Sequence, residues 1–168
     1  MADVIYQRIA LIGVSVNPNS VGGKVLSNLV TGGFRGVVYP VNSESEAVMG
    51  IPCYPDLVSL PKTPDLGVIC APAELVPGLV RACGEAGILG VIVVSAGFRE
   101  AGEEGRALED RVRSEAARFP GMRILGPNCL GIIIPSLRLH CSFGGGMPKA
   151  VSIAFISQSG ALCTSVLD

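Results

Sequence analysis

Short runs of Val, Ile and Leu alternate along the chain with segments whose apolar residues recur at helical spacing. Continuous apolar runs of this kind are typical of strands that are covered on both faces of a parallel sheet. The predicted strands are residues 8–14, 36–41, 66–71, 90–94 and 122–125, and the predicted helices are 22–30, 56–60, 74–86 and 103–118. This βαβ series predicts an α/β fold with a Rossmann-like, doubly wound parallel sheet.

The pattern changes after Pro127. Residues 132–134 predict an excursion at the edge of the sheet, and the glycine-rich stretch 139–146 predicts a linker. Residues 151–156 predict one more buried strand, with a helix cap at 157–160. Because the chain stops at Asp168 after only a short helix, we expect a piece cut from a longer protein. In this interpretation residues 1–147 form one domain, and 148–168 are the truncated start of a second, flavodoxin-like α/β domain.

Composition narrows the class of protein. The chain has 168 residues, of which 49% are hydrophobic and 16% charged, and its formal net charge is -1, so a globular domain is expected without a nucleic-acid or membrane partner. The start of the chain lacks the basic and apolar segments of a signal peptide, and no apolar run is long enough to cross a bilayer. A cytoplasmic protein is expected. The six cysteines show neither a C-x-x-C pair nor zinc-like spacing, so neither a disulfide framework nor a metal site is predicted.

A glycine-rich segment, GVSVNPNSVGGK from Gly13 to Lys24, joins the first predicted strand to the first predicted helix. Glycine lets the backbone turn tightly and approach a ligand, and the first amides of a helix offer partial positive charge to an anion. The segment therefore predicts a cradle for phosphate. The simpler alternative is that its serines and asparagines act only as helix caps and turn residues.

NAD is one phosphate compound that the cradle could hold. In an open parallel sheet, ligands bind outside the carboxyl ends of the strands, where the loops after each strand meet. However, the spacing here differs from the G-x-G-x-x-G of NAD enzymes, and such a site wants an acidic residue at the end of the second strand. Glu44 lies near that position, so an NAD-binding Rossmann domain stays open as an alternative.

Seven motifs follow one another along nearly the whole chain and resemble a known family. They are GVSxNPxSVGGKVLxNL, VYPVN, GIPCYPDLxxLP, DLGVICAPAELVP, VIVVSAGF, ILGPNCLGI and IAFISQSGAL. In this order they resemble the CoA-binding domain of the NDP-forming acyl-CoA synthetases, which are relatives of the succinyl-CoA synthetase α subunit. The resemblance implies coenzyme A as the cofactor. It also implies a complete ligase that converts acyl-CoA, ADP and phosphate to acid, CoA and ATP through an acyl phosphate and a phosphohistidine.

The same resemblance implies roles for individual residues. The CoA phosphates would meet Gly13, Ser15, Ser20, Val21, Gly22 and Lys24. Its adenosine and pantetheine would lie along Pro40, Asn42, Ala71 and Pro72, with Ser95, Gly97 and Asn128 near the thiol end. The helix start with Ser157, Ser159 and Gly160 resembles the segment that would support the phosphohistidine.

The resemblance also implies that the rest of the machinery lies outside this chain. The phosphorylated histidine belongs to the missing second domain, so no catalytic residue is expected here and the chain alone should be inactive. ADP, ATP and Mg would bind elsewhere in the full enzyme. Its partner would be an ATP-grasp domain or β subunit, and the full-length form is expected to be an oligomer.

One departure from the family pattern and several alternatives remain. The family often has a basic residue after VYPVN that can meet the 3'-phosphate of CoA, whereas this chain has Ser43 and Glu44. Either the affinity for CoA is weaker, or another cation such as Lys24, Arg35 or Lys62 takes over. Cys129 could be a nucleophile or a wall residue of the site, and the sole histidine, His140, is expected to pack or lie at the surface. The same domain also occurs fused to acetyltransferases, where it would sense CoA and regulate. Nothing in the sequence specifies the acyl substrate.

Overall fold

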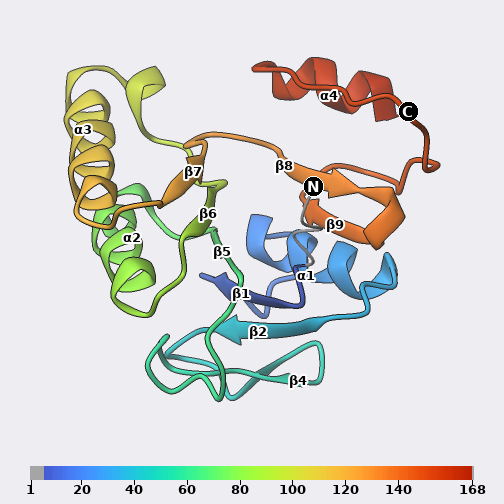
Figure 1. Cartoon of the computed structure of the whole chain (residues 1–168), viewed down its shortest axis with the longest axis horizontal. Helices are drawn as coiled ribbons and strands as arrows, with labels where there is room; N and C mark the ends of the chain where they lie inside the picture. The colour runs from blue at the N-terminus through green and yellow to red at the C-terminus, as the bar shows by residue number, and fades with distance from the viewer. Residues whose placement is uncertain (1–5, 168) are drawn as a thin grey trace.

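The protein is represented by a computed structural model that describes residues 6–167, and a five-stranded parallel sheet lies at its centre (Figure 1). The strands stand in the order β2-β1-β5-β6-β7, and every neighbouring pair is parallel. Their bounds are β1 Arg8–Ile12, β2 Val37–Val41, β5 Leu66–Ile69, β6 Gly90–Val93 and β7 Arg123–Leu125. All five predicted strands are therefore confirmed.

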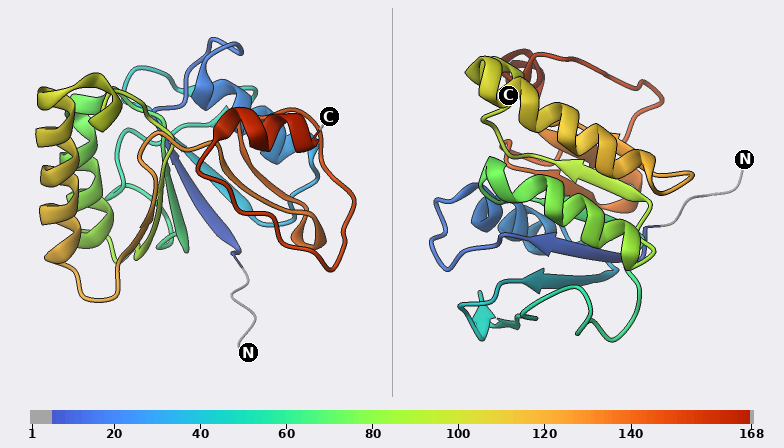
Figure 2. Two further views of the ribbon diagram at one scale, coloured as in Figure 1. Left: turned by 90° about the horizontal axis from the view of Figure 1, so that it is seen from above. Right: turned by 90° about the vertical axis from the view of Figure 1, so that its left-hand side faces the viewer.

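Helices cover both faces of this sheet (Figure 2). Helix α1 (Val21–Thr31) lies on one face, and α2 (Val76–Glu85) and α3 (Glu103–Ala117) lie on the other. Short 3-10 turns, Ala73–Leu75, Arg99–Ala101 and Pro135–Leu137, precede α2, α3 and the last strand. This arrangement confirms the predicted doubly wound, Rossmann-like fold.

A hydrophobic core lies on each face of the sheet, because successive side chains of a strand point to opposite faces. In β1, Ile9 and Leu11 point into the cluster that contains Leu26 of α1, whereas Ala10 and Ile12 point into the cluster that contains Val80 of α2. All of them are 4% exposed or less. Burial of a side chain such as Leu26 stabilises the fold by roughly 1.5–3 kcal/mol, so neither face of the strand could tolerate a polar residue.

A hairpin replaces the linker that the sequence predicts over 139–146. Strand β8 (Gly131–Ile134) pairs with β9 (Leu139–Ser142) in antiparallel fashion, and β9 is buried against α1. The side-chain amide of Asn28 on α1 donates to the carbonyls of Ser142 and Gly144 at 2.8 and 2.9 Å. The glycines that suggested a linker begin only after β9, so the linker interpretation was wrong for residues 139–142.

The predicted helix over 56–60 is also absent from the described chain. Residues 47–48 and 51–52 form a small hairpin instead, β3 (Ala47–Val48) and β4 (Ile51–Pro52), and Tyr54 bridges to the end of β2. Asp56 then closes a turn, because its Oδ1 accepts the amide N–H of Ser59 at 2.8 Å. This bond has the pattern of a helix N-cap, but the residues after it form only a turn, and Pro61 disfavours the helical conformation at Leu60.

The C-terminal segment differs from the expected strand as well. Residues 151–156 form no strand, and Val151, Ile153 and Ile156 are 71%, 82% and 93% exposed. Their apolar pattern suits a strand, but no neighbouring strand of residues 6–167 offers them hydrogen bonds. The predicted helix after this segment is present as α4 (Gly160–Leu167). Within residues 6–167, no helix has the length and apolar character that a bilayer crossing requires.

Candidate functional site

The carboxyl edge of the sheet contains the point where the strand order reverses. From β1 the chain goes outward to β2, and it then crosses back over β1 to β5. The loops after β1 and β5 therefore leave in opposite directions and open a crevice between them, which is where doubly wound sheets bind ligands. The predicted phosphate cradle follows β1 and so lies at this crevice.

Gly13 begins the cradle in a conformation that favours glycine. Its φ is +81°, and an added Cβ would lie only 2.9 Å from the amide nitrogen of Ala71 and from the carbonyl of Cys70. Its own N–H donates to the carbonyl of Val41 at 3.1 Å. A tight turn with no side chain thus brings the loops after β1, β2 and β5 into contact, as expected for a backbone that approaches a ligand.

The start of α1 keeps unused amide donors. Ser20 is the N-cap, and its Oγ accepts the N–H of Gly23 at 3.0 Å, while its carbonyl accepts the N–H of Lys24 at 2.9 Å. The N–H groups of Val21 and Gly22 have no acceptor among residues 6–167, and the first turn carries no acidic residue. These donors and the helix dipole favour an anion at this position.

The serines of the loop also show the simpler role that the sequence left open. Ser15 Oγ accepts the N–H of Asn17 at 3.1 Å, and Ser20 Oγ donates to the carbonyl of Asn17 at 2.7 Å. Asn17 Oδ1 accepts the N–H of Asn19 at 3.0 Å. Turn and cap bonds therefore hold the loop in shape before any ligand arrives.

Hydrogen bonds link the predicted residues along the whole edge. Asn42 Nδ2 donates to the carbonyl of Val14 at 2.6 Å, which joins the loops after β2 and β1. Ser95 Oγ donates to the carbonyl of Ala71 at 2.5 Å, which joins the loops after β6 and β5. The N–H of Asn128 donates to the carbonyl of Ser95 at 2.9 Å. Residues from five separate loops thus form one continuous surface, to which Pro40, Pro72 and Gly97 also belong as loop and strand-end residues.

Glu100 is a residue of this edge that the sequence analysis missed. Its Oε1 accepts the N–H groups of Gly97 and Phe98 at 2.7 and 3.2 Å. Partial burial raises the pKa of Glu100, but these hydrogen bonds and one with the Asn128 side chain outweigh it and leave the pKa below its ordinary value. The carboxylate therefore shapes the loop after β6. The sequence feature that could have indicated this role of Glu100 is an acidic residue close after a glycine turn, where its carboxylate can accept the amide N–H groups of that turn.

The thiols near this edge are poor nucleophiles. Burial raises the pKa of Cys129, whose thiol donates to the carbonyl of Val93 at 3.3 Å. Burial and the nearby Cys129 raise the pKa of Cys70 to about 12. Both remain protonated at neutral pH, which supports the interpretation of Cys129 as a wall residue. All six cysteines of the chain are free.

His140 is buried in β9 rather than placed in a linker. It is 3% exposed, and its Nε2 has no hydrogen-bond partner among the described residues. Burial lowers its pKa, so the ring is neutral and packs against the turn that follows α1. The expected packing role is therefore confirmed.

The cations proposed for the 3'-phosphate separate into two groups. Lys24 lies in the first turn of α1, at the crevice. Arg35 and Lys62 line a cavity of about 770 Å³ at the amino ends of β1 and β2, on the opposite edge of the sheet. They cannot take part at the carboxyl edge, so that prediction was wrong for both. Glu44 is exposed beyond β2, where its N–H donates to Asn42 Oδ1 at 2.7 Å.

The predicted helix start lies on a separate segment. The N–H of Ser159 donates to Ser157 Oγ at 3.0 Å, and Ser159 Oγ accepts the N–H of Leu162 at 3.3 Å. Gly160 begins α4, which Figure 1 shows away from the carboxyl ends of the sheet. Among residues 6–167, no group of three or more His, Cys, Asp or Glu side chains could hold a metal ion.

Comparison with known proteins adds evidence about the family. A family model described as "CoA binding domain" matches residues 7–135. The chain is 41% identical over 169 residues to "Acetate--CoA ligase [ADP-forming] I" of Archaeoglobus fulgidus, covering 100% of this chain and 24% of that ligase. It is 37% identical over 164 residues to "4-hydroxybutyrate--CoA ligase [ADP-forming]" of Nitrosopumilus maritimus, covering 96% of this chain and 23% of that ligase.

Solved structures show the same architecture. The dinucleotide-forming acetyl-coenzyme A synthetase 1 of Ca. Korarchaeum cryptofilum, in complex with phosphate and ADP, aligns with a TM-score of 0.86 and 39% identity over 96% of this chain and 34% of that chain. A protein from Pyrococcus horikoshii OT3 aligns with a TM-score of 0.91 and 39% identity, over 99% of this chain and 38% of that chain. The chain spans about a quarter of the two ligases above.

Proposed function

Because this chain belongs to the family of CoA-binding domains, we propose that it binds coenzyme A in the crevice at the carboxyl edge of the sheet. The observation that carries the proposal is the start of α1. Two amide groups there, those of Val21 and Gly22, have no acceptor within the described range 6–167, and the turn at Gly13 brings three loops together beside them. A pyrophosphate is the kind of group that such donors hold.

In the proposed pose, the phosphates of CoA lie on the loop from Gly13 to Lys24. The adenosine and pantetheine follow Pro40 and Asn42 on one side and Ala71 and Pro72 on the other. The thiol end reaches Ser95, Gly97 and Asn128. The hydrogen bonds among these loops support the pose, because a surface that is already held in shape loses little entropy when a long, flexible ligand binds.

Lys24 is the cation that we assign to the 3'-phosphate. It is exposed and lies in the first turn of α1, and no salt bridge of residues 6–167 includes it. Glu44 is exposed beyond β2, next to Asn42, and its carboxylate would repel a phosphate there. CoA should therefore place its 3'-phosphate on the Lys24 side.

We further propose that the chain is part of an NDP-forming, succinyl-CoA synthetase-like acid–CoA ligase. Its ADP and Mg sites and its phosphohistidine would belong to other parts of that enzyme, an ATP-grasp domain or β subunit among them. Residues 148–168 would begin the second domain, where Ser157, Ser159 and Gly160 support the phosphohistidine loop. The exposed apolar residues of this segment are consistent with a partner surface. We expect a cytoplasmic, oligomeric enzyme.

The test is calorimetric titration of the purified chain with CoA, dephospho-CoA and NAD at low salt. CoA should bind more tightly than dephospho-CoA, and NAD should bind least. Equal binding of CoA and dephospho-CoA would remove Lys24 from the 3'-phosphate, and a preference for NAD would overturn the proposal. The chain alone should show no ligase turnover with acetate, CoA and ATP.

A further inference from the structure

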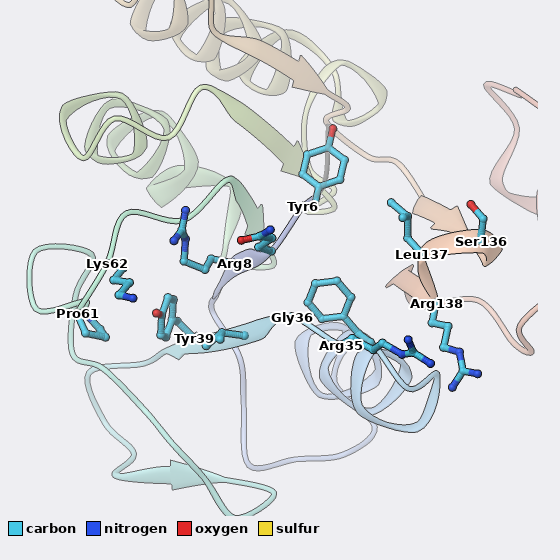
Figure 3. Close-up of a pocket in the computed structure, with 13 residues that line it drawn as sticks. Tyr6, Arg8, Arg35, Gly36, Tyr39, Pro61, Lys62, Ser136, Leu137 and Arg138 are labelled. Carbon is cyan, nitrogen blue, oxygen red and sulfur yellow. The ribbon is translucent and has the colours of Figure 1, made fainter. Parts of the chain in front are cut away.

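A second concave site lies at the edge of the sheet opposite to the CoA crevice. A cavity of about 770 Å³ opens at the amino ends of β1 and β2 (Figure 3). Its walls come from the start of β1, the turn between α1 and β2, residues 61–62, and the turn between β8 and β9. This volume lies within the range of about 300–1,000 Å³ that is usual for small-molecule sites.

The described walls of this cavity, which we call the amino-edge pocket, carry positive charge. Arg8, Arg35, Lys62 and Arg138 line it, and no Asp or Glu among residues 6–167 does. The formal net charge of the whole chain is -1, so the concentration of cations here is local. Among the salt bridges of residues 6–167, only Arg8 of these cations has a partner, Asp65 at 3.1 Å. Unpaired cations around one cavity raise the local potential and favour an anion.

Arg8 is held in place at the base of the pocket. Asp65 Oδ2 accepts the backbone N–H groups of Gln7 and Arg8 at 2.9 and 2.8 Å, and Oδ1 accepts from Arg8 Nη2 at 3.1 Å. Arg8 Nε is buried and has no hydrogen-bond partner among the described residues. Only Nη2 bonds to Asp65, and the Arg8 side chain is 32% exposed, so Nη1 keeps donors that Asp65 does not use.

Arg35 and Arg138 lie on the other side of the pocket from Arg8, Lys62 and Tyr39 (Figure 3). Arg138 has a left-handed backbone, with φ 52° and ψ 29°, and its guanidinium lies against Gly33, where an added Cβ would be 3.5 Å from Nη1. Arg35 follows two positions after Gly33. The two arginines thus lie near one another on this side of the pocket, where both can reach the oxygens of one phosphate chain.

Aromatic rings supply the rest of the wall. Tyr6, Phe34 and Tyr39 line the pocket, although only 5% of the chain is aromatic. Tyr39 is only 6% exposed and is held by an edge-to-face contact with Tyr54, with ring centroids 5.6 Å apart, so the rings open to a ligand are those of the half-buried Tyr6 and Phe34. Rigid aromatic walls accept a flat ring by stacking, and arginine adds cation–π attraction.

From this combination of rings and unpaired cations, we propose that the amino-edge pocket is a second ligand site, which binds a nucleoside di- or triphosphate. The base stacks on the aromatic wall, and the phosphates lie between Arg35 and Arg138. An acidic peptide would use the cations but would leave the rings without a partner. The site is separate from the CoA crevice, and a nucleotide there would occupy the pocket without displacing CoA.

The experiment is a ¹⁵N NMR titration of the 168-residue chain with ADP in EDTA, repeated with pyrophosphate and with CoA. ADP should shift amides of residues 34–37 and 136–138 in a saturable manner, and pyrophosphate should bind more weakly. The double variant Arg35→Gln/Arg138→Gln should weaken ADP at least about tenfold, or about 1.4 kcal/mol, while CoA affinity stays unchanged. Phe34→Leu should weaken ADP more than pyrophosphate.

Arg106→Gln/Arg111→Gln is the matched control, because it removes the same charge from exposed positions of α3 outside the pocket. It should leave ADP affinity unchanged. Three results would overturn the proposal: shifts confined to the loop 13–24, no saturation by ADP up to about 1 mM, or pyrophosphate affinity equal to that of ADP. A tetraglutamate peptide that binds more tightly than ADP and displaces it would identify the pocket as a protein-docking site instead.

Discussion

Replacing Gly13 with alanine tests how closely the loop after β1 packs against β5. Gly13 has φ +81°, and an alanine Cβ would lie 2.9 Å from the nitrogen of Ala71 and from the carbonyl carbon and oxygen of Cys70. All three are backbone atoms of another strand end, so they cannot move aside as the tip of a long side chain can. The substitution should therefore destabilise the fold and also distort the surface that we assign to CoA.

The expected loss has two parts. An L side chain in the left-handed region costs about 1–2 kcal/mol, and the lower entropy of the unfolded alanine chain offsets about 0.4–1 kcal/mol of this cost. Overpacking against the backbone of β5 adds about 1–3 kcal/mol. The net loss in free energy of unfolding is about 1–4.6 kcal/mol, which corresponds to a fall in Tm of about 2–18 °C for a chain of this length.

Gly50→Ala is the control for the first part. Gly50 has φ +75°, and no heavy atom of residues 6–167 lies within 4 Å of an added Cβ. Its loss should stay below about 1.5 kcal/mol. Thermal unfolding followed by circular dichroism gives both Tm values, and titration with CoA gives the binding. Equal falls in Tm would refute the close packing of Gly13, and unchanged CoA affinity in a folded Gly13→Ala variant would refute its place in the crevice.

Three further substitutions test other parts of the structure. Burial lowers the pKa of His140, so its ring stays neutral in the folded chain, whereas the unfolded chain takes up a proton below about pH 6.5. The free energy of unfolding therefore falls as the pH falls from about 7 to 5. In urea unfolding at each pH, His140→Phe should lack this pH-dependent part of the stability. A variant with the same pH slope as the wild type would contradict this cause. Ser20→Ala removes the cap on the Gly23 amide and should cost about 1 kcal/mol, whereas Ser20→Gly should cost only about a few tenths; equal losses in Tm would argue against the cap. Lys24→Gln should weaken CoA about fivefold, or about 1 kcal/mol, and leave dephospho-CoA unchanged in calorimetry, because one exposed charge on the 3'-phosphate is lost. An equal loss for both ligands would assign Lys24 to the pyrophosphate instead.

The parallel sheet could be predicted from the sequence because its strands have a simple physical signature. Strands that are buried on both faces must be apolar at every position, and β5 and β6 are of this type. The glycine-rich loop could be found for a similar reason, since its conformation requires glycine at Gly13. These features are local, so a short window of sequence contains them.

The errors arose where partners distant in sequence decide the structure. Residues 151–156 have the composition of a strand, but no strand of the described chain, 6–167, pairs with them. Residues 139–142 are a strand because they pair with β8 and pack on α1. Glu100 was missed because its acceptor role depends on how the loop after β6 folds. The position of Arg35 at the amino edge of the sheet likewise could be inferred only with knowledge of the strand order. Composition cannot report such contacts.

The hydrogen bonds between Asn28 and the residues at the end of β9 determine where this domain can be truncated for expression on its own or for fusion to another protein. The match to the family model ends at residue 135, before β9 begins. Yet Leu139 and Cys141 are fully buried with Leu26 and Leu29 of α1, and two hydrogen bonds from Asn28 fasten the strand beyond them. A truncation at residue 135 would remove β9 and expose the apolar side chains of α1 that β9 covers, and these exposed side chains would promote aggregation. The smallest portable unit extends through Gly144.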